Sequence, residues 1–332
     1  MDDHKFIEGL FSIQDGSKFE QMAMELFSHQ AVHNDTYATY LDMLKINRER
    51  IQKLDDIPFL PIEFFKSHHL ATGTWDAEIV FHSSGTGSDA VSKHPIKDLS
   101  VYRRSFINGF KSVYGNPERY ILLCLLPNYT KNPHSSLIFM TDALIRLSGH
   151  RLSGYYLNED DALCQAINVG VASDRKVLLM GVSYALLDLM NNPNLPDMSD
   201  VIVMETGGMK GNRKEMLKEE LHLTLKNGLG VGEIHSEYGM AELLSQAYAK
   251  GNGRFTCPPW MRVSARDVND PLKPLGPGRS GGLNIIDLAN VYSCAFIATQ
   301  DLGKVYADGL FELLGRFDAS DIRGCNLLLA EQ

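Results

Sequence analysis

The first quarter of the chain has the apolar spacing of amphipathic helices. Between residues 17 and 53, apolar side chains recur three and four positions apart, as at Phe19, Met22 and Leu26. This period places them on one face of a helix. The next segment, IPFLPIEFF at 57–65, contains two prolines, which restrict the backbone and disfavour a continuing helix. We therefore expect helices first and an extended or turning path at 57–65.

From residue 78 the pattern changes to short, continuous apolar runs that alternate with helix-length segments. Runs of this kind are typical of strands buried on both faces, which mostly lie in parallel sheets covered by helices. The pattern therefore predicts an α/β fold. The runs are EIVFH (78–82), YILLCLLP (120–127), KVLLMG (176–181), DVIVMET (200–206) and AFIATQ (295–300).

Residues 251–282 interrupt this alternation with eleven Gly or Pro residues. We expect a loop-rich or antiparallel section there. It contains GPGRSG at 276–281, which has the G-x-G-x-x-G spacing of a dinucleotide-binding turn. Prolines precede and interrupt this hexapeptide and no helical pattern follows it, so the sequence does not predict a dinucleotide site.

Composition excludes several kinds of partner. The 332 residues carry 32 Lys or Arg against 41 Asp or Glu, a net charge of −9, which argues against nucleic-acid binding. The longest apolar run, Tyr120–Leu126, is far shorter than the ~20 residues of a membrane helix. No signal-peptide pattern opens the chain, so we expect a cytoplasmic protein. Its five scattered cysteines favour neither zinc nor a disulfide framework.

Two segments follow predicted strands and could contact a nucleotide. HSSGTGSDAVSK, at 82–93, offers hydroxyls beside glycines that can wrap phosphate oxygens, and Lys93 could neutralise their charge. The alternative is a Ser/Gly linker. ETGGMKG, at 205–211, places Gly207 and Gly208 at a strand's carboxyl end, where a flat ring can approach the backbone. Here the alternative is a tight turn from strand to helix.

Two pairs of residues could complete such a site. In SEYGMAE, Tyr238 and Glu242 are four positions apart, so a helical turn would place them on one face. The carboxylate could hold Mg²⁺ against a phosphate. Asp301 ends an apolar run and could accept both ribose hydroxyls, while Arg316 offers planar donors to the same sugar or to a phosphate. Each of these residues taken alone could equally be an ordinary surface charge or helix residue.

A hydrolase is a further interpretation. GVSYA, at 181–185, is close to the G-x-S-x-G elbow of α/β-hydrolases, with Ser183 as nucleophile. The required histidine would be His222 or His235.

The order of the segments is more specific than any one of them. SSGTG, GGMKG, EYGMAE, TQDLG and GRFD follow one another as the core motifs of the adenylate-forming superfamily do. IPFLPIEFFKSHHL, SSGT with a later SKH, and ETGGMKG resemble one branch, the acyl-protein synthetases or long-chain-fatty-acid–luciferin-component ligases. The resemblance implies the large domain of that fold, with parallel-sheet α/β subdomains and a loop-rich β section, at 1–315. A hinge-like tail, 316–332, is then expected in place of the usual C-terminal domain.

The resemblance also implies roles for individual residues. The phosphate loop would be Ser83, Ser84, Gly85, Thr86 and Lys93. The remaining nucleotide contacts would be Gly207, Gly208, Tyr238, Gly239, Met240, Asp301 and Arg316. Glu242 would hold Mg²⁺, and Cys325 would accept the acyl group. The chain departs from the family's usual SSGTTG loop and has Met240 where many relatives have Thr or Pro.

The implied function is ATP-dependent activation of a carboxylic acid, expected to be a fatty acid, to an acyl-adenylate. The acyl group would then pass to the thiol of Cys325 and onward to an acceptor such as an acyl reductase or a carrier protein. Two alternatives stay open. One is a CoA ligase of the phenylacetate type that uses free CoA, and the other is a non-catalytic nucleotide-binding protein.

Overall fold

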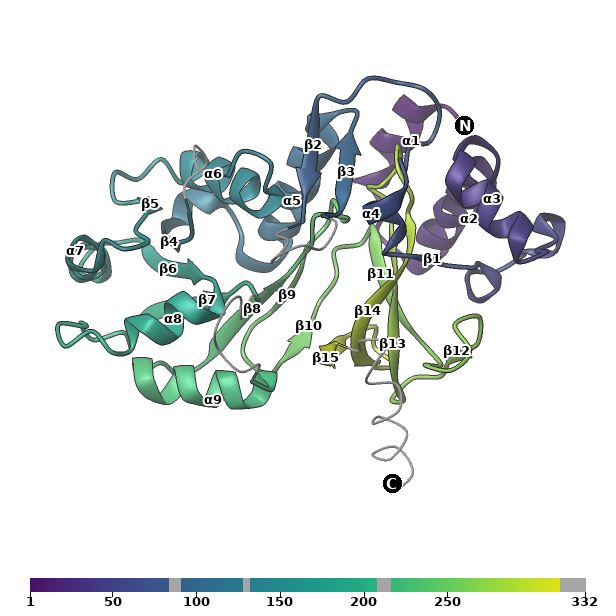
Figure 1. Ribbon diagram of the computed structural model, residues 1–332. Coiled ribbons are helices and arrows are strands. Elements are labelled where there is room, and N and C mark those ends of the chain that lie inside the picture. The colour runs from purple at the N-terminus through teal and green to yellow at the C-terminus, as the bar shows by residue number, and fades with distance from the viewer. Residues whose placement is uncertain (84–90, 128–131, 208–215, 317–332) are drawn as a thin grey trace. The chain divides into compact units, whose positions relative to one another are not determined.

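The computed structural model describes residues 1–83, 91–127, 132–207 and 216–316. Two compact units divide the chain (Figure 1). The central unit is Asp76–Pro258, and the terminal unit combines Met1–Trp75 with the chain from Pro259 onward. Each unit has its own sheet. The predicted boundary at residue 316 coincides with the last described residue, so the predicted tail lies outside the description.

A parallel sheet forms the centre of the central unit. Its strand order is β5-β4-β6-β7-β8-β9, and only β9 runs antiparallel to its neighbour. Three predicted apolar runs form β4, β6 and β7, which confirms the expected α/β fold. The bounds are β4 Tyr120–Leu125, β5 Gly154–Tyr155, β6 Lys176–Gly181, β7 Val201–Glu205, β8 Ile234–Tyr238 and β9 Ala247–Ala249.

Helices cover both faces of this sheet, which explains why its strands are apolar without alternation. Ile121, Leu123 and Leu179 point to the face on which α7, α8 and α9 pack. On the other face, Phe110 of α5 contacts the ring of Tyr120, with centroids 5.8 Å apart. The helices are α5 Leu99–Tyr114, α6 Ser136–Ser148, α7 Asp160–Val171, α8 Ser183–Leu189 and α9 Lys218–Leu229.

The EIVFH run does not join the parallel sheet. It forms β2 (Ile79–His82), which pairs antiparallel with β3 (Lys93–Ile96) in a two-stranded hairpin. Its apolar character comes from Phe81, whose ring packs 5.7 Å from that of Phe139 on α6. An apolar run reports burial and not strand direction, so the expectation of a parallel strand was wrong here.

A buried histidine attaches this hairpin to the segment that follows β8. His94 lies on β3, and its Nδ1 is 2.8 Å from the carbonyl oxygen of Ala241. Since that oxygen can only accept, Nδ1 carries the proton and donates it. Burial lowers the pKa of His94 to about 4, so the ring is neutral at pH 7. The hairpin that flanks the predicted phosphate loop is thereby held to the EYGMAE segment.

The terminal unit contains an antiparallel sheet. Along it, β15, β14, β13, β11 and β12 are neighbours, and β1 adds to β14 in parallel. The antiparallel section expected at 251–282 is confirmed, whereas the AFIATQ run was expected in the parallel sheet and lies here instead, in β14. The bounds are β1 Leu60–Pro61, β11 Met261–Arg266, β12 Pro274–Leu275, β13 Ser280–Asp287, β14 Phe296–Val305 and β15 Phe311–Arg316.

Helices near the N-terminus explain why β14 starts as an apolar run. Phe27 of α2 and Tyr37 of α3 pack on the ring of Phe296, with centroids 5.9 and 6.1 Å away. Gln30 of α2 is buried and accepts the N–H of Ala295 while its amide donates to backbone oxygens nearby. The expected helices between 17 and 53 are confirmed as α2 Gly16–His33 and α3 Asp35–Met43, preceded by α1 Asp3–Leu10.

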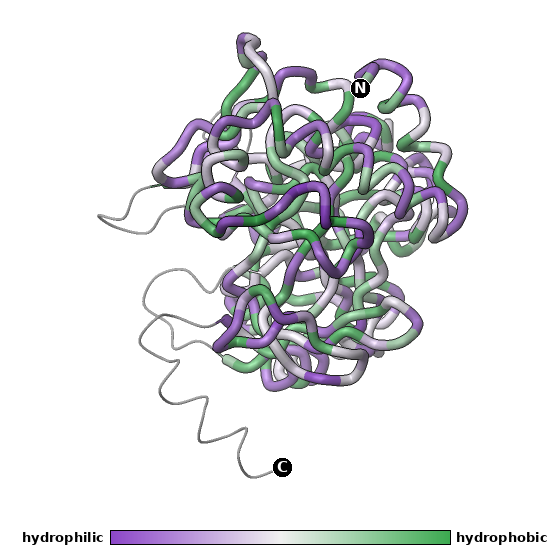
Figure 2. Tube along the Cα trace, turned by 90° about the vertical axis from the view of Figure 1, so that its right-hand side faces the viewer, coloured by the Kyte–Doolittle hydropathy of each residue, from purple (hydrophilic) through white to green (hydrophobic). Residues whose placement is uncertain are grey.

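The remaining helices and strands are short. The proline-bounded segment at 57–65 is extended through β1, as expected, and then enters the single turn α4. No described helix combines the length and apolarity that crossing a membrane requires. Figure 2 shows hydrophobic stretches running through the interior and hydrophilic ones at many outer loops. The remaining bounds are η1 Arg48–Arg50, η2 Leu54–Asp56, α4 Phe64–Ser67, η3 Pro117–Arg119 and β10 Arg254–Phe255.

The GPGRSG hexapeptide ends inside β13 and has a packing role. A Cβ on Gly281 would overlap the backbone carbonyl of Arg266 on the neighbouring strand β11. Arg266 is itself buried, and its guanidinium donates to the carbonyl oxygens of Leu283 (2.6 Å) and Thr299 (2.5 Å) and to Asn284 Oδ1 (2.9 Å). A strand follows the glycines and not a helix, which confirms that the hexapeptide is no dinucleotide-binding turn.

We predict that Gly281→Ala destabilises the protein by about 1–3 kcal/mol, because the added methyl group meets backbone that cannot move aside. Gly276→Ala is the matched control, since nothing lies within 4 Å of a Cβ built there. Chemical denaturation measures both free energies of unfolding. Equal effects of the two substitutions would contradict the packing argument.

A second prediction concerns pH and His94. Its folded pKa of about 4 lies below the usual 6.5, so the unfolded chain binds the proton first as the pH falls. Stability is therefore lost as the pH falls from about 6.5 to 4. Between pH 7 and pH 5, His94→Gln should lose about 2 kcal/mol less unfolding free energy than the unsubstituted protein. Identical losses in urea titrations at the two pH values would refute this prediction.

Candidate functional site

The carboxyl ends of three parallel strands meet at one edge of the central sheet. In the register, Gly181 of β6 lies opposite Glu205 of β7, which in turn lies opposite Ser236 of β8. Open α/β sheets bind ligands at this edge. The predicted segments that contain Gly207 and Tyr238 leave from the two adjacent strands β7 and β8, so the structure brings their starting points together.

A buried carboxylate organises this edge. Glu205 is 1% exposed; its Oε1 accepts from Lys218 Nζ at 2.7 Å and lies 3.4 Å from His222 Nε2, and its Oε2 accepts the N–H of Gly207 at 2.8 Å. Burial would raise the pKa of Glu205, but Lys218 and the hydrogen bonds of His222 and Ser236 hold it well below its usual range. The carboxylate is charged, and it anchors the turn in which Gly207 adopts φ +70°, a conformation that favours glycine.

Sequence reasoning missed this network. Lys218 and His222 are four positions apart on α9, which is the spacing of side chains on one helix face. That spacing could have marked them as a pair. Their common partner, Glu205, is the first residue of ETGG, but only the fold places it beside the helix.

The EYGMAE segment is a strand end followed by a turn. Tyr238 is the last residue of β8 and pairs with Ala247 of β9, so it is extended. The N–H of Leu243 donates to the carbonyl of Met240 in the turn that follows. The predicted helical turn with Tyr238 and Glu242 on one face is therefore wrong, because cross-strand pairing keeps the first of them extended.

Glu237 lies against the glycine of this segment. A Cβ on Gly239 would overlap the Glu237 carboxyl group, so the end of the Glu237 side chain would have to shift. Burial, and next the negative charge of Glu205, raise the pKa of Glu237 to about 8. At pH 7 it is therefore mostly a neutral acid, which lets a second carboxyl group lie near Glu205.

Glu242 has the chemistry of a Mg²⁺ ligand but no cluster around it. Glu242 is 5% exposed. Among the described residues, no three His, Cys, Asp or Glu side chains gather in a way that could hold a metal ion. Mg²⁺ is ordinarily bound through one or two carboxylates together with substrate phosphates and water. A single carboxylate therefore fits a Mg²⁺ ion that arrives with a nucleotide.

The start of the predicted phosphate loop is held by its own strand ends. The N–H of Ser83 donates to Ser92 O at 3.1 Å, and Ser83 Oγ accepts the N–H of Ser92 at 3.0 Å. Lys93 is exposed and lies opposite His82, whose ring stacks on that of His134 at 4.7 Å. Burial, then His134 and Lys93, lower the pKa of His82.

Five predicted site residues lie outside the described part of the chain. Their roles stay predictions. They are Ser84, Gly85, Thr86, Gly208 and Cys325.

In the terminal unit the structure brings Asp301 and Arg316 together. They are register partners on β14 and β15, and Arg316 Nε lies 3.4 Å from Asp301 Oδ1. The Asp301 side chain is 13% exposed, whereas that of Arg316 is 64% exposed. The contact of these two residues with a ribose stays a prediction.

The hydrolase interpretation does not fit the structure. Ser183 is the first residue of α8 and is 1% exposed, whereas a nucleophile at an elbow must present its hydroxyl. His222 contacts Glu205 and Ser236, and His235 Nδ1 lies 3.0 Å from the Tyr114 hydroxyl. Both candidate histidines are thus engaged elsewhere.

Two of the described cysteines are structural, as their apolar setting predicted. Cys124 and Cys294 are buried, and burial raises the pKa of each thiol to about 12. Neither is a thiolate at pH 7, and the thiolate is the form that attacks.

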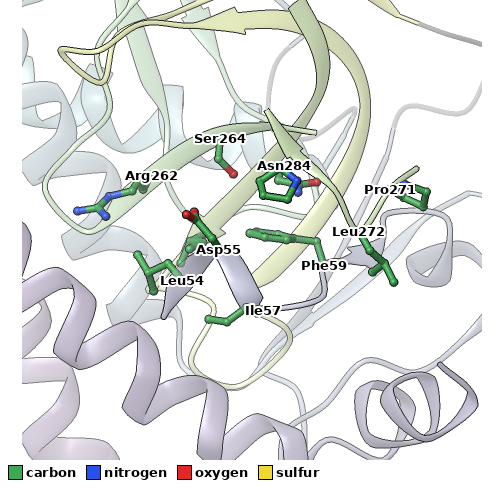
Figure 3. A pocket seen from close by; sticks show the side chains of 11 residues that line it. Leu54, Asp55, Ile57, Phe59, Arg262, Ser264, Pro271, Leu272 and Asn284 are labelled. Carbon is green, nitrogen blue, oxygen red and sulfur yellow. The ribbon is translucent and has the colours of Figure 1, made fainter. Parts of the chain in front are cut away.

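None of the residues that line a pocket in the terminal unit is a predicted site residue (Figure 3). The pocket combines apolar side chains with Asp55, Arg262, Ser264 and Asn284. The apolar lining is Leu54, Ile57, Phe59, Pro271, Leu272, Pro274 and Ile286.

Comparison with solved structures shows the fold. The structure resembles ATP-bound MatB from Rhodopseudomonas palustris, with TM-score 0.53 and 16% identity over 74% of this chain and 49% of MatB. The chain thus spans about half the length of MatB. It also resembles 2-hydroxyisobutyryl-CoA ligase in complex with 2-HIB-AMP and CoA, with TM-score 0.67 and 12% identity over 92% of this chain and 70% of the ligase. These are adenylate-forming enzymes, which confirms the expected fold.

Comparison of sequences identifies the family. The chain is 24% identical to the long-chain-fatty-acid–luciferin-component ligase of Aliivibrio fischeri, over 94% of this chain and 87% of the relative. It is 22% identical to the ligase of the same name from Vibrio harveyi, over 90% and 84%. A profile of the family described as acyl-protein synthetase, LuxE, matches residues 10–332. This chain, with its adenylate-forming fold, therefore belongs to the acyl-protein synthetase family.

Proposed function

We propose that this protein uses ATP to activate a fatty acid as an acyl-adenylate and then transfers the acyl group to the thiol of Cys325. From that thioester the acyl group passes to an acceptor protein. The observation that carries the proposal is the family match across residues 10–332. Relatives named as ligases of a long-chain fatty acid and a luciferin component support the acid and the protein acceptor.

The geometry of the central unit supports nucleotide chemistry at the carboxyl edge of its sheet. The His94 contact with Ala241 holds the hairpin beside the phosphate loop to the segment that carries Glu242. Glu205 holds the turn at Gly207, where the glycine leaves the backbone without a side chain.

In the first step, a carboxylate oxygen of the acid attacks the α-phosphorus of ATP. The bond from that phosphorus to the bridging oxygen breaks, and pyrophosphate leaves with the electron pair. Lys93 is exposed beside the phosphate loop and would stabilise the negative charge that moves to pyrophosphate. Glu242 would hold Mg²⁺, which when bound neutralises phosphate charge.

In the second step, the Cys325 thiol loses its proton to solvent and its sulfur attacks the acyl carbon. The bond between that carbon and the AMP oxygen breaks, and AMP leaves as the anion. The neighbouring Arg323 would favour the thiolate form. The product is a thioester, which is reactive enough to pass its acyl group to a further nucleophile.

We predict that Glu242→Gln lowers fatty-acid-dependent ATP–pyrophosphate exchange by at least about 100-fold, because a neutral amide is a poor Mg²⁺ ligand. Exchange of radiolabelled pyrophosphate into ATP measures this step without the thiol. Glu219→Gln, an exposed change on α9, is the control and should keep full exchange. Unreduced exchange in Glu242→Gln would show that the metal assignment is wrong.

We predict that incubation with fatty acid, ATP and Mg²⁺ adds one acyl group to the protein, seen in its intact mass and removed by hydroxylamine. Cys325→Ser should abolish the adduct but keep pyrophosphate exchange, whereas Cys257→Ser should keep both. An unchanged adduct in Cys325→Ser would rule out this residue as the acceptor. Acyl-CoA formed when CoA is added, without a protein adduct, would identify a CoA ligase instead.

A further inference from the structure

The proline-bounded segment at 57–65 has no role in the proposed chemistry, yet the terminal unit builds it into its sheet. Leu60 and Pro61 pair in parallel with Ile297 and Ala298 of β14, and the N–H of the next residue donates to Ala298 O at 3.0 Å. β14 continues from there to Asp301. The segment is thus aligned with the strand that carries the predicted ribose ligand.

This alignment places Glu63 beside Gln300. Gln300 Nε2 donates to Glu63 Oε1 at 2.5 Å, and Gln300 Oε1 accepts from Arg316 Nη2 at 3.3 Å. Arg316 Nε lies 3.4 Å from Asp301 Oδ1. A chain of polar contacts therefore leads from Glu63 through Gln300 and Arg316 to Asp301.

The donor-to-acceptor direction of these hydrogen bonds depends on Glu63. A carboxylate only accepts hydrogen bonds, so it requires the amide nitrogen of Gln300 to face it. The amide oxygen then faces the guanidinium of Arg316, which only donates. Without Glu63 the amide can rotate by half a turn and present its N–H groups to Arg316, where they repel. Arg316, 64% exposed, would then lose one of the two contacts that hold it over Asp301.

A second arginine balances the charge of this cluster. Arg266 is buried, and burial lowers its pKa to about 10, while Glu63 and Asp301 act in the opposite direction. The positive charge of Arg266 therefore interacts with both carboxylates.

We propose that Glu63 is a positioning residue for the ribose of the nucleotide and acts through Gln300 on Arg316 and Asp301. This inference rests on the proposed function for the identity of the ligand. Glu63 would orient the two side chains that are proposed to bind the 2′- and 3′-hydroxyl groups, which gives the proline-bounded segment a part in nucleotide recognition.

The test compares equilibrium binding of ATP with that of 2′,3′-dideoxy-ATP, which lacks both hydroxyl groups. The unsubstituted protein should bind ATP more tightly. Glu63→Ala should weaken ATP binding about tenfold and leave dideoxy-ATP binding unchanged, since only the ribose contact is lost. Isothermal titration calorimetry without fatty acid measures both constants. Glu49→Ala, an exposed change elsewhere in the terminal unit, should alter neither.

A reciprocal exchange guards against variants that merely misfold. Gln300→Glu places two carboxylates side by side and should also lose the preference for ATP. Combining Glu63→Gln with Gln300→Glu restores a donor facing an acceptor and leaves an acceptor facing Arg316, so the preference should return. Equal losses for both nucleotides, or a double variant no better than Glu63→Ala, would show that Glu63 only supports β1.

This experiment separates the inference from the proposed function. Binding needs no carboxylic acid, so a Glu63-dependent preference in a protein without pyrophosphate exchange would support the inference and refute adenylation. Normal exchange together with an unchanged preference in Glu63→Ala would refute the inference alone. A protein that does not distinguish ATP from dideoxy-ATP would refute it as well.

Discussion

The parallel strands of the central unit must all end at one edge of their sheet, and the candidate site depends on this constraint. Gly181, Glu205 and Ser236 come from three separate parts of the chain but lie in one row across β6, β7 and β8. The segments after these strands therefore start beside one another. The helix α9, which connects β7 to β8, also supplies Lys218 to the same edge.

The buried carboxyl groups at this edge are stabilised in two ways, one by ion pairing and the other by protonation. Burying a carboxylate is costly unless a cation and hydrogen bonds replace water, and Glu205 has Lys218, His222 and the N–H of Gly207. At Glu237, burial and the charge of Glu205 outweigh the opposing charge of Lys218, so this carboxyl group keeps its proton up to a pH of about 8. The result is a nearly neutral group of polar side chains next to the segments that are proposed to bind the nucleotide.

The terminal unit uses antiparallel pairing for a similar purpose. A hairpin of β14 and β15 brings residues 301 and 316 face to face, so a carboxylate meets a guanidinium without any helical connection. The parallel addition of β1 then brings Glu63, from far upstream, into hydrogen-bonding distance of the same pair's neighbour, Gln300. Polar groups thus gather at strand ends in the central sheet and along paired strands in the terminal sheet.

Much of the local structure could be predicted from the residues themselves. The apolar period identified α2 and α3, the continuous apolar runs identified β4, β6 and β7, and prolines identified the extended path before α4. The order of short motifs identified the family. Other expectations failed at β2, at the start of β14 and at Tyr238, where cross-strand pairing outweighs local pattern. The spacing of Lys218 and His222 indicates a shared helix face, but neither their partner Glu205 nor the contact between Glu63 and Gln300 could be read from the residues.

What the sequence by itself determined is therefore which segments are buried, which are extended or helical, and which known family they resemble, because these follow from side-chain chemistry over short spans. The tertiary structure alone decided strand direction, register and the partners of buried charges. Those depend on contacts between residues as distant as Glu63 and Gln300, or His94 and Ala241, and hydrophobic period carries no information about them. The tendency of a segment to be buried follows from its own side chains, whereas the pairing of strands and charges depends on contacts that form only when the chain folds.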